Sequence, residues 1–236
     1  MKAIAAREIS AYYNTMTGYV FTSICLLVCG IFFAAENLVG GSASFTNVIG
    51  SISYVLVLIT PLLTMRLFAE ERKNKSEQML LTAPVSITKI VLGKYLAALT
   101  VLLVALVISL IFPLILFMVG EPYILEILLG YLGVILLGSV FISIGMFISA
   151  NTENQLTAAI FSMGILFLLW LMDAIIPSVA NPVIGQIISG LSLYNQFDSF
   201  QVGVLSLPSV LYFLSMTFLF LFFTVHTIEK RRWSKG

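Results

Sequence analysis

The sequence predicts an all-α polytopic membrane protein with about six transmembrane helices. Three observations support this fold class. Of the 236 residues, 60% are hydrophobic and 10% are charged, and the mean hydropathy is +1.08. A soluble core could not hide so much apolar surface, and the apolar runs repeatedly exceed the roughly 20 residues that span a bilayer. The twelve Lys and Arg residues also fall on a single side of the predicted membrane.

The predicted spans form one transmembrane domain, residues 17–228. The first apolar run is long for a signal peptide and is followed by others, so we interpret it as a span. Pro61 and Pro113 lie inside spans, where proline kinks or breaks a helix. Gly145 and Ser149 form a small-xxx-small face that favours close packing within one subunit. The spans are expected at 17–35, 48–69, 90–119, 124–150, 155–176 and 208–228.

The distribution of Lys and Arg predicts the topology. These residues occur in 1–16, around the loop 70–88 and in the basic tail 229–236. The loops on the opposite side, 36–46, 120–123 and 173–207, contain none. Positive charge marks the cytoplasmic side, so we expect a multi-pass protein of the cytoplasmic membrane with both termini in the cytoplasm. Residues 1–16 are also a candidate amphipathic interfacial helix, with Lys2 and Arg7 available to anionic headgroups.

The segment 177–207 is predicted to be an external cap. Pro, Gly and Asn interrupt it too often for a span, yet its apolar stretches suit short re-entrant helices, whose irregular backbone must be covered by protein. The candidate cap residues are Tyr194, Phe197 and Phe200. These aromatic side chains fit an amphipathic cargo no better than they fit an interfacial aromatic belt, so the sequence does not name the cargo.

The cytoplasmic loop carries the candidate site. Arg66 and Glu70 are four residues apart and can pair on a helix, Ser76 can cap a new helix, and Pro84 would end it. Such a helix presents apolar residues 79–81 within a charged rim, which suits docking to a partner protein. The alternative is a solvated basic loop held by lipid headgroups. The candidate coupling residues are Glu70, Glu71, Arg72, Lys73, Ser76, Met79, Leu80, Leu81 and Pro84.

Motifs along nearly the whole chain carry a family resemblance. These motifs lie at residues 7–9 together with Tyr12 and Tyr13, at residues 70–85, 90–94 and 152–155, at Leu191-Ser192-Leu193 together with Phe197, and at residues 229–233. Together they resemble ABC-2 type permeases, the membrane subunits of ATP-driven transporters, and in particular the gliding-motility-associated and nitrous-oxide-reductase-maturation branch. Many such relatives have Gly at the position of Lys75 and Glu at that of Gln78, so we assign Gln78 no salt bridge to a partner.

The resemblance implies a type V exporter-like architecture: an N-terminal connecting helix, six spans, a cytoplasmic coupling helix and external re-entrant helices. It implies an exporter in which two permeases, either two copies of this chain or this chain and a related permease, join two ATPase subunits. Membrane lipids and an accessory extracytoplasmic subunit are further candidate partners; nucleic acid is not. Gly93-Lys94 is followed by Tyr95 and lacks a phosphate-binding motif, so we expect no catalytic residue and no cofactor here, with ATP and Mg on the ATPase.

A secondary transporter or channel, working without an ATPase, is the main alternative function, because it shares this hydropathy profile. Such proteins usually carry charges or broken helices at the membrane midplane. The acidic residues of the predicted external half lie at or near its interface: Glu36, Glu121, Glu126, Asp173 and Asp198.

Protease and metal-binding functions are disfavoured by residue placement. Ser192 is predicted to be external and His226 to lie near the cytoplasmic end of the last span, so a nucleophile and base would be about 30 Å apart. A glutamate-dependent protease needs a His near its acids, and Glu70-Glu71 has none nearby in the sequence. Cys25 and Cys29 share a helix face but are interpreted as buried small hydrophobes, and the nine Met residues are scattered. We therefore expect no metal site.

Overall fold

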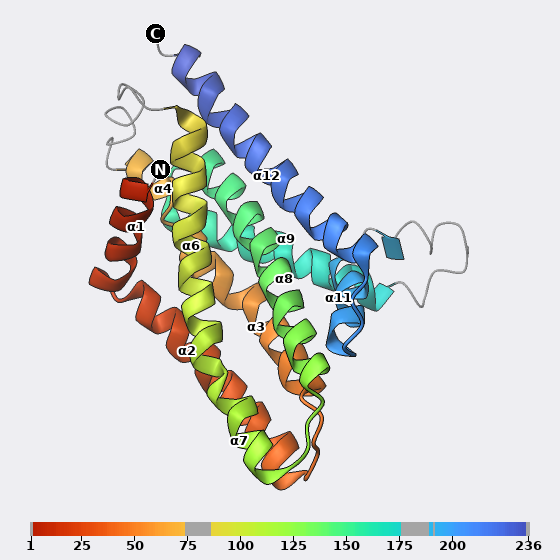
Figure 1. Ribbon diagram of the computed structural model, residues 1–236. Coiled ribbons are helices and arrows are strands. Elements are labelled where there is room, and N and C mark those ends of the chain that lie inside the picture. The colour runs from red at the N-terminus through yellow and green to blue at the C-terminus, as the bar shows by residue number, and fades with distance from the viewer. Residues whose placement is uncertain (1, 74–85, 176–188, 191, 235–236) are drawn as a thin grey trace.

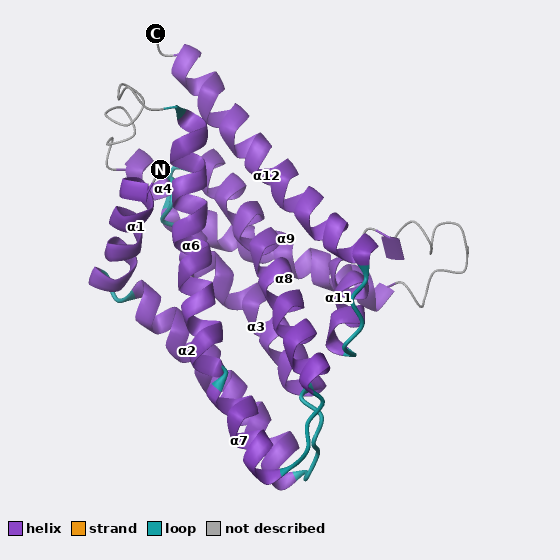
Figure 2. Ribbon diagram, in the orientation of Figure 1, coloured by secondary structure: helices purple, strands orange, loops and turns teal. Residues whose placement is uncertain are grey.

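The structure is a computed structural model that describes residues 2–73, 86–175, 189–190 and 192–234. Every regular element in these ranges is a helix, and no strand occurs in them (Figure 2). The predicted all-α fold class is confirmed. The elements are α1 (Lys2–Asn14), α2 (Thr17–Phe32), the π-helix η1 (Phe33–Val39), α3 (Thr46–Thr64), α4 (Ala69–Lys73), α6 (Ile87–Ser109), α7 (Ile111–Val119), α8 (Ile124–Asn151), α9 (Gln155–Ile175), α11 (Leu193–Gln201) and α12 (Leu207–Ser234).

Six helical segments are long and apolar enough to cross a membrane, as the sequence predicted. The first extends beyond residue 35 because α2 continues directly into η1. The second continues past α3 through a turn into α4, so it reaches further than residue 69. The six segments are Thr17–Val39, Thr46–Lys73, Ile87–Val119, Ile124–Asn151, Gln155–Met172 and Leu207–Arg231.

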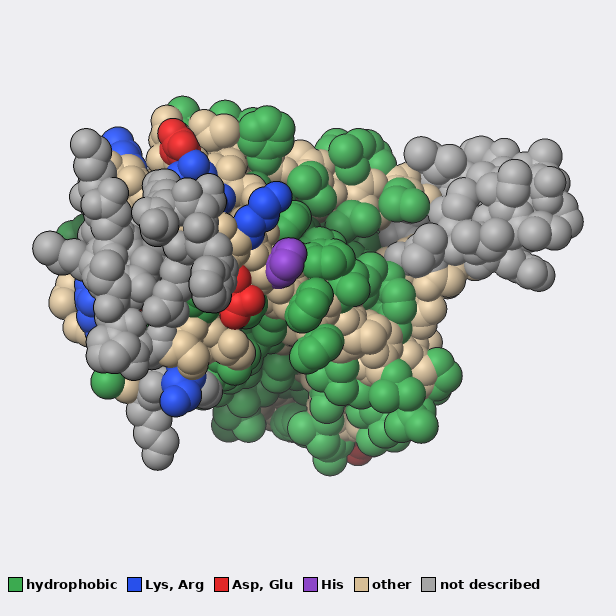
Figure 3. Space-filling model, turned by 90° about the horizontal axis from the view of Figure 1, so that it is seen from above, with side chains coloured by type: hydrophobic (Ala, Val, Ile, Leu, Met, Phe, Trp, Pro, Cys, Tyr) green, Lys and Arg blue, Asp and Glu red, His purple; other side chains and the backbone are tan. Residues whose placement is uncertain are grey.

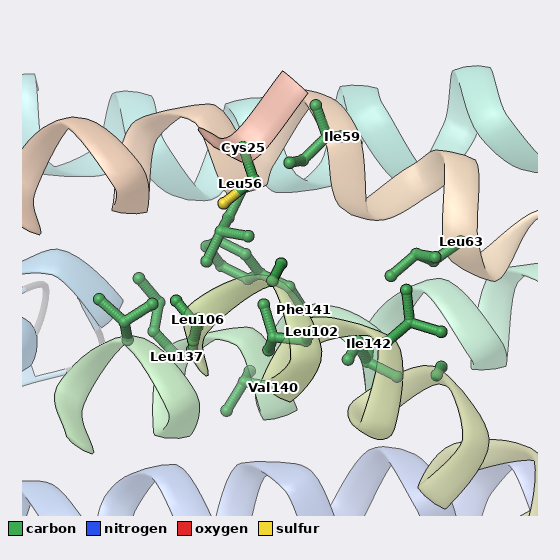
Figure 4. Packing of buried hydrophobic residues seen from close by; sticks show 14 of the residues in the cluster. Cys25, Leu56, Ile59, Leu63, Leu102, Leu106, Leu137, Val140, Phe141 and Ile142 are labelled. Atoms are coloured by element: carbon green, nitrogen blue, oxygen red, sulfur yellow. The ribbon is translucent and has the colours of Figure 1, made fainter. Parts of the chain in front are cut away.

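The helices α3 and α8 form the centre of the bundle. In the most apolar stretch of each span that contains α3 or α8, 72% of the residues are buried. In the corresponding stretches of the spans that contain α9 and α12, 17% are buried. The outer helices thus keep apolar faces exposed, as expected for helices that contact lipid. Figure 4 shows the core between α2, α3, α6 and α8, where Cys25, Leu56, Leu102 and Phe141 are all buried.

Glycines on α8 let its backbone approach α3 closely. A Cβ added to Gly130 would lie 2.2 Å from Ile49 Cδ1, and one added to Gly145 would lie 2.2 Å from Thr64 Oγ1. Both partners are on α3, near its two ends. The predicted close packing at Gly145 is therefore confirmed.

Two interruptions have clear local causes. Met16 adopts a left-handed conformation with φ 61°, and this residue forms the corner between α1 and α2. The third span breaks where α6 ends at Ser109, because Pro113 has no N–H to donate to the Ser109 carbonyl and its ring crowds that oxygen. Pro61, by contrast, lies inside α3 without ending it.

The two ends of the molecule differ in the elements that they contain. The start of α1, the helix α4 and the end of α12 lie at one end, at the top of Figure 1. The η1–α3 and α7–α8 connections lie at the opposite end. The first end carries the predicted cytoplasmic segments, so the fold is compatible with the topology predicted from charge.

Candidate functional site: a polar hub around α4

The short helix α4, Ala69–Lys73, follows the second span and leads into the predicted coupling loop. Charged side chains gather over this part of the molecule, whereas hydrophobic side chains cover much of the remaining visible surface (Figure 3). Polar contacts join α4 and the turn before it to α1, α6, α8 and the α8–α9 turn. We call their side chains the α4 hub: Glu8, Arg66, Glu70, Glu71, Arg72, Lys94, Ser149 and Glu153.

A buried ion triad joins α1, α4 and α6. Lys94, on α6, is 1% exposed. Its Nζ lies 3.0 Å from Glu8 Oε1 on α1 and 2.8 Å from Glu71 Oε1 on α4. The ammonium also lies 5.3 Å from the centre of the Phe68 ring, within cation–π range. A buried charge is strongly destabilising without its partners, so Lys94 holds both carboxylates to α6.

Arg66 ties the turn before α4 to the corner between α1 and α2. Its Nε donates to Glu70 Oε2 at 2.8 Å and its Nη2 to Glu70 Oε1 at 3.3 Å, which makes the pair bidentate. Its Nη1 donates to Thr17 Oγ1 at 2.9 Å and also to Thr15 Oγ1. The Arg66–Glu70 pair predicted from the four-residue spacing is therefore confirmed. Arg66 also connects this turn to a segment about 50 residues earlier in the chain.

Ser149, near the end of α8, caps α4 from a neighbouring helix. Its Oγ accepts hydrogen bonds from the backbone N–H groups of Phe68 and Ala69, both at 3.2 Å, and donates to the Met65 carbonyl at 3.2 Å. The first N–H groups of a helix have no partner within the helix itself. Ser149 pairs in a buried place with the first N–H of α4, that of Ala69, and with the N–H of Phe68 just before the helix, and so fixes α8 to the α3–α4 turn.

Two arginines hold the C-terminal end of α8. Arg72, on α4, pairs with Glu153 in the turn between α8 and α9. Arg231, on α12, donates to the Ala150 carbonyl, one of the last carbonyls of α8. A cation near a helix C-terminus also interacts favourably with the helix dipole. The α8–α9 turn is therefore linked to α4, and the last turn of α8 is linked to α12.

A cavity of about 200 Å³ lies between α1, α4 and α6, lined mainly by charged side chains of the α4 hub. Tyr12 forms part of its wall, and its hydroxyl donates to the Leu63 carbonyl at 2.7 Å. Burial and then the charge of Glu8 raise the pKa of Tyr12, while Arg66 lowers it less. The hydroxyl stays protonated at neutral pH and keeps α1 attached to the end of α3.

The helix α11 packs against the opposite half of α8. Phe197 and Phe200 are fully buried and Tyr194 is nearly so. The Tyr194 hydroxyl donates to the Ser53 carbonyl at 3.2 Å. A Cβ added to Gly133 would lie 2.6 Å from Phe200 Cβ, so only glycine admits this contact without a shift. The aromatic residues of the predicted cap thus pack inside the protein rather than forming an exposed belt.

The sequence of this chain matches a known protein family. A family model described as ABC-2 family transporter protein matches residues 3–228. This chain belongs to the ABC-2 transporter family. ABC-2 permeases are typically non-catalytic membrane subunits and usually work with an ABC ATPase. No curated protein matches the chain.

Several coupling residues predicted for this ABC-2 permease lie in α4. Glu70, Glu71 and Arg72 all form ion pairs within the chain, and Lys73 is the last residue of α4 and is exposed. Arg72, expected as a rim charge for a partner, already has Glu153 as an intramolecular partner. Ser76, Met79, Leu80, Leu81 and Pro84 lie outside the described residues.

The residues that could suggest a protease or a metal site make ordinary packing and capping contacts in this ABC-2 permease. Ser192 accepts a hydrogen bond from the Asn195 N–H and caps α11. The His226 ring stacks on that of Phe222 on the same helix. Cys25 and Cys29 are free thiols, both buried in the core. Among the described residues no group of three or more His, Cys, Asp or Glu could hold a metal ion.

Sequence reasoning did not foresee the buried triad. The sequence pattern indicates Lys94 only as one of the positive charges and as part of short motifs, and Glu8 only as part of the motif at 7–9. The available signal was a lysine near the start of an otherwise apolar span, since such a charge is costly unless it is paired. Two carboxylates in segments predicted at the same membrane face were the natural partners, but the choice among several acids depended on how the helices pack.

Proposed function

We propose that this chain is the permease subunit of an ATP-driven exporter of the cytoplasmic membrane. In this proposal both termini and the loop after α4 face the cytoplasm. A separate ATPase binds ATP and Mg and docks on residues 70–84. Closure of the ATPase subunits moves this loop and switches the membrane helices between inward- and outward-facing states. Two permeases, two copies of this chain or this chain and a related one, share one transporter.

One observation in the structure supports coupling at this place: α4 cannot be displaced without disturbing three spans. The Glu71–Lys94 pair connects it to α6, and Ser149 connects it to α8. Arg72 connects it to the turn that leads into α9. Separating the buried pair would cost about 3–5 kcal/mol, because it leaves an uncompensated charge. A force applied to the loop after α4 therefore moves these helices together.

The finer assignment within the family also belongs to this proposal. The motifs at 7–9, 152–155 and 229–233 support the gliding-motility-associated and nitrous-oxide-reductase-maturation branch. The cargo is left open. An accessory extracytoplasmic subunit would meet the end of the molecule that holds the η1–α3 and α7–α8 connections.

Co-purification with a co-expressed ATPase tests the proposal. We expect Leu80→Ala combined with Leu81→Ala to reduce the yield of bound ATPase severalfold without reducing membrane insertion, since buried apolar anchors dominate binding energy. A matched control is Val202→Ala combined with Leu205→Ala, two exposed aliphatic residues on the other side of the protein, at 66% and 57% exposure.

The second measurement is ATP hydrolysis by the complex in proteoliposomes. The coupling variant should hydrolyse ATP without transport or should lose stimulation by the permease, whereas the control should behave like the wild type. If no ATPase associates with the wild-type chain, the proposal is wrong and a secondary transporter or channel becomes the better interpretation.

A further inference from the structure

Glu126, at the start of α8, binds the beginning of α3 through one carboxylate oxygen. Its Oε1 accepts hydrogen bonds from Ser44 Oγ at 2.8 Å, from the Phe45 backbone N–H at 2.9 Å and from Thr46 Oγ1 at 2.6 Å. We call these four residues the Glu126 clasp. Ser44 and Phe45 precede α3, and Thr46 is its first residue.

The chemistry of this contact suits a carboxylate. The N-terminus of α3 exposes backbone N–H groups and the positive end of the helix dipole, both of which favour a negative charge. Phe45, the residue that caps α3, offers no side-chain hydrogen bond of its own. The loops predicted on this side contain no Lys or Arg that could neutralise Glu126. Hydrogen-bond donors at the beginning of α3 therefore stabilise its charge.

The same clasp contacts the end of α11. Thr46 Oγ1 lies 3.3 Å from the Gln201 carbonyl, at the last residue of α11. Gly203, with φ +74°, packs on the Glu126 backbone so closely that an added Cβ would lie 3.1 Å from Glu126 Cα. Val204 N–H then donates to the Ser199 carbonyl at 2.9 Å and closes the end of α11. Glu126 thus lies where α3, α8 and the exit of α11 meet.

At its other end α8 is fixed to α4 by Ser149, as described above. The helix has 28 residues, which corresponds to about 42 Å. Between the two fixed ends, Gly130 and Gly145 keep α8 in close contact with α3. The pair α3 and α8 is therefore held together near both ends, so the two helices are expected to move as one rigid unit.

We propose that Glu126 is a positioning residue that joins α3, α8 and α11 into one rigid body, so that movement of the α4 hub reaches α11 at the far half of the protein. This inference rests on the proposed function for its role in transport. Its structural content, the mechanical joining of α11 to α3, is independent of any ATPase.

Hydrogen exchange of the full chain in lipid nanodiscs tests the structural content. Glu126→Ala should speed exchange at the Phe45 amide by about 10- to 100-fold, because a hydrogen bond to a charged acceptor is lost. It should also speed exchange at the Val204 amide, because the exit of α11 loses its support. Glu126→Gln keeps a carbonyl acceptor and should restore part of the protection. The matched control is Glu121→Ala, an exposed acid in the loop before α8.

The possible results distinguish these roles of Glu126. Unchanged exchange at Phe45 in Glu126→Ala would show that Glu126 does not hold the beginning of α3 and would refute the proposal. Faster exchange at Phe45 with unchanged exchange at Val204 would show that Glu126 only caps α3, and would overturn its proposed connection to α11. In the complex with the ATPase, vanadate trapping should alter exchange in both α4 and α11 of the wild type, but only in α4 of Glu126→Ala. Failure of the wild type to bind an ATPase would refute the proposed function while leaving the first experiment valid.

Discussion

Replacing Lys94 by methionine tests the α4 hub at a fully buried charge. Methionine has a similar length and fills the same space, but it leaves Glu8 and Glu71 side by side without the ammonium at 3.0 and 2.8 Å. Their side chains are only 18% and 15% exposed, so water cannot replace the lost partner well. Removing one member of a buried ion pair costs about 3–5 kcal/mol.

Thermal unfolding of the purified chain, followed by circular dichroism in one fixed detergent, measures this cost. For a chain of 236 residues, we expect the apparent Tm to fall by about 10 °C. Lys89→Met is the matched control, because Lys89 is exposed in the first turn of the same helix, and its Tm should stay within about 2 °C of the wild type.

A compensated variant separates the loss of charge pairing from the loss of packing. Adding Glu8→Gln and Glu71→Gln to Lys94→Met removes all three charges, and well-packed neutral groups often replace a buried ion pair at little cost. At least half of the lost Tm should return. An unchanged Tm in Lys94→Met, or a further drop in the neutral triple variant, would show that the triad does not hold α1 and α4 to α6.

Three further predictions concern other parts of the molecule. Ser149→Ala leaves two buried N–H groups unpaired and should lower stability by about 1–3 kcal/mol in the same assay. The control Ser162→Ala removes a buried hydroxyl that has no partner among the described residues, so it should be neutral or stabilising. Gly133→Ala places a Cβ 2.6 Å from an aromatic side chain of α11 and should cost about 1–3 kcal/mol and expose α11 to protease; Gly164→Ala, with nothing within 4 Å, should not. Green fluorescent protein fused after Gly236 should fluoresce and alkaline phosphatase fused there should stay inactive; the reverse pattern would refute a cytoplasmic C-terminus.

The sequence determined the features that depend on local composition. Six apolar runs predicted six spans, because hydropathy and length are properties of contiguous residues. The break before Pro113 followed from a missing donor within one helical turn. The Arg66–Glu70 pair followed from a four-residue spacing, which brings the two side chains together although Arg66 lies in the turn before α4. The small residues Gly145 and Ser149 likewise predicted where a helix is approached closely.

Tertiary structure decided which polar groups meet across the spans. Lys94 pairs with Glu8, 86 residues earlier, and with Glu71, 23 residues earlier. Several other acids were compatible with the sequence, and only the packing of α1 and α4 against α6 selects these two. Ser149 caps α4 over a separation of 80 residues, and Glu126 binds Phe45 over 81. Such contacts leave no periodic signal, since each depends on the relative rotation and depth of two helices, which packing of the whole bundle sets.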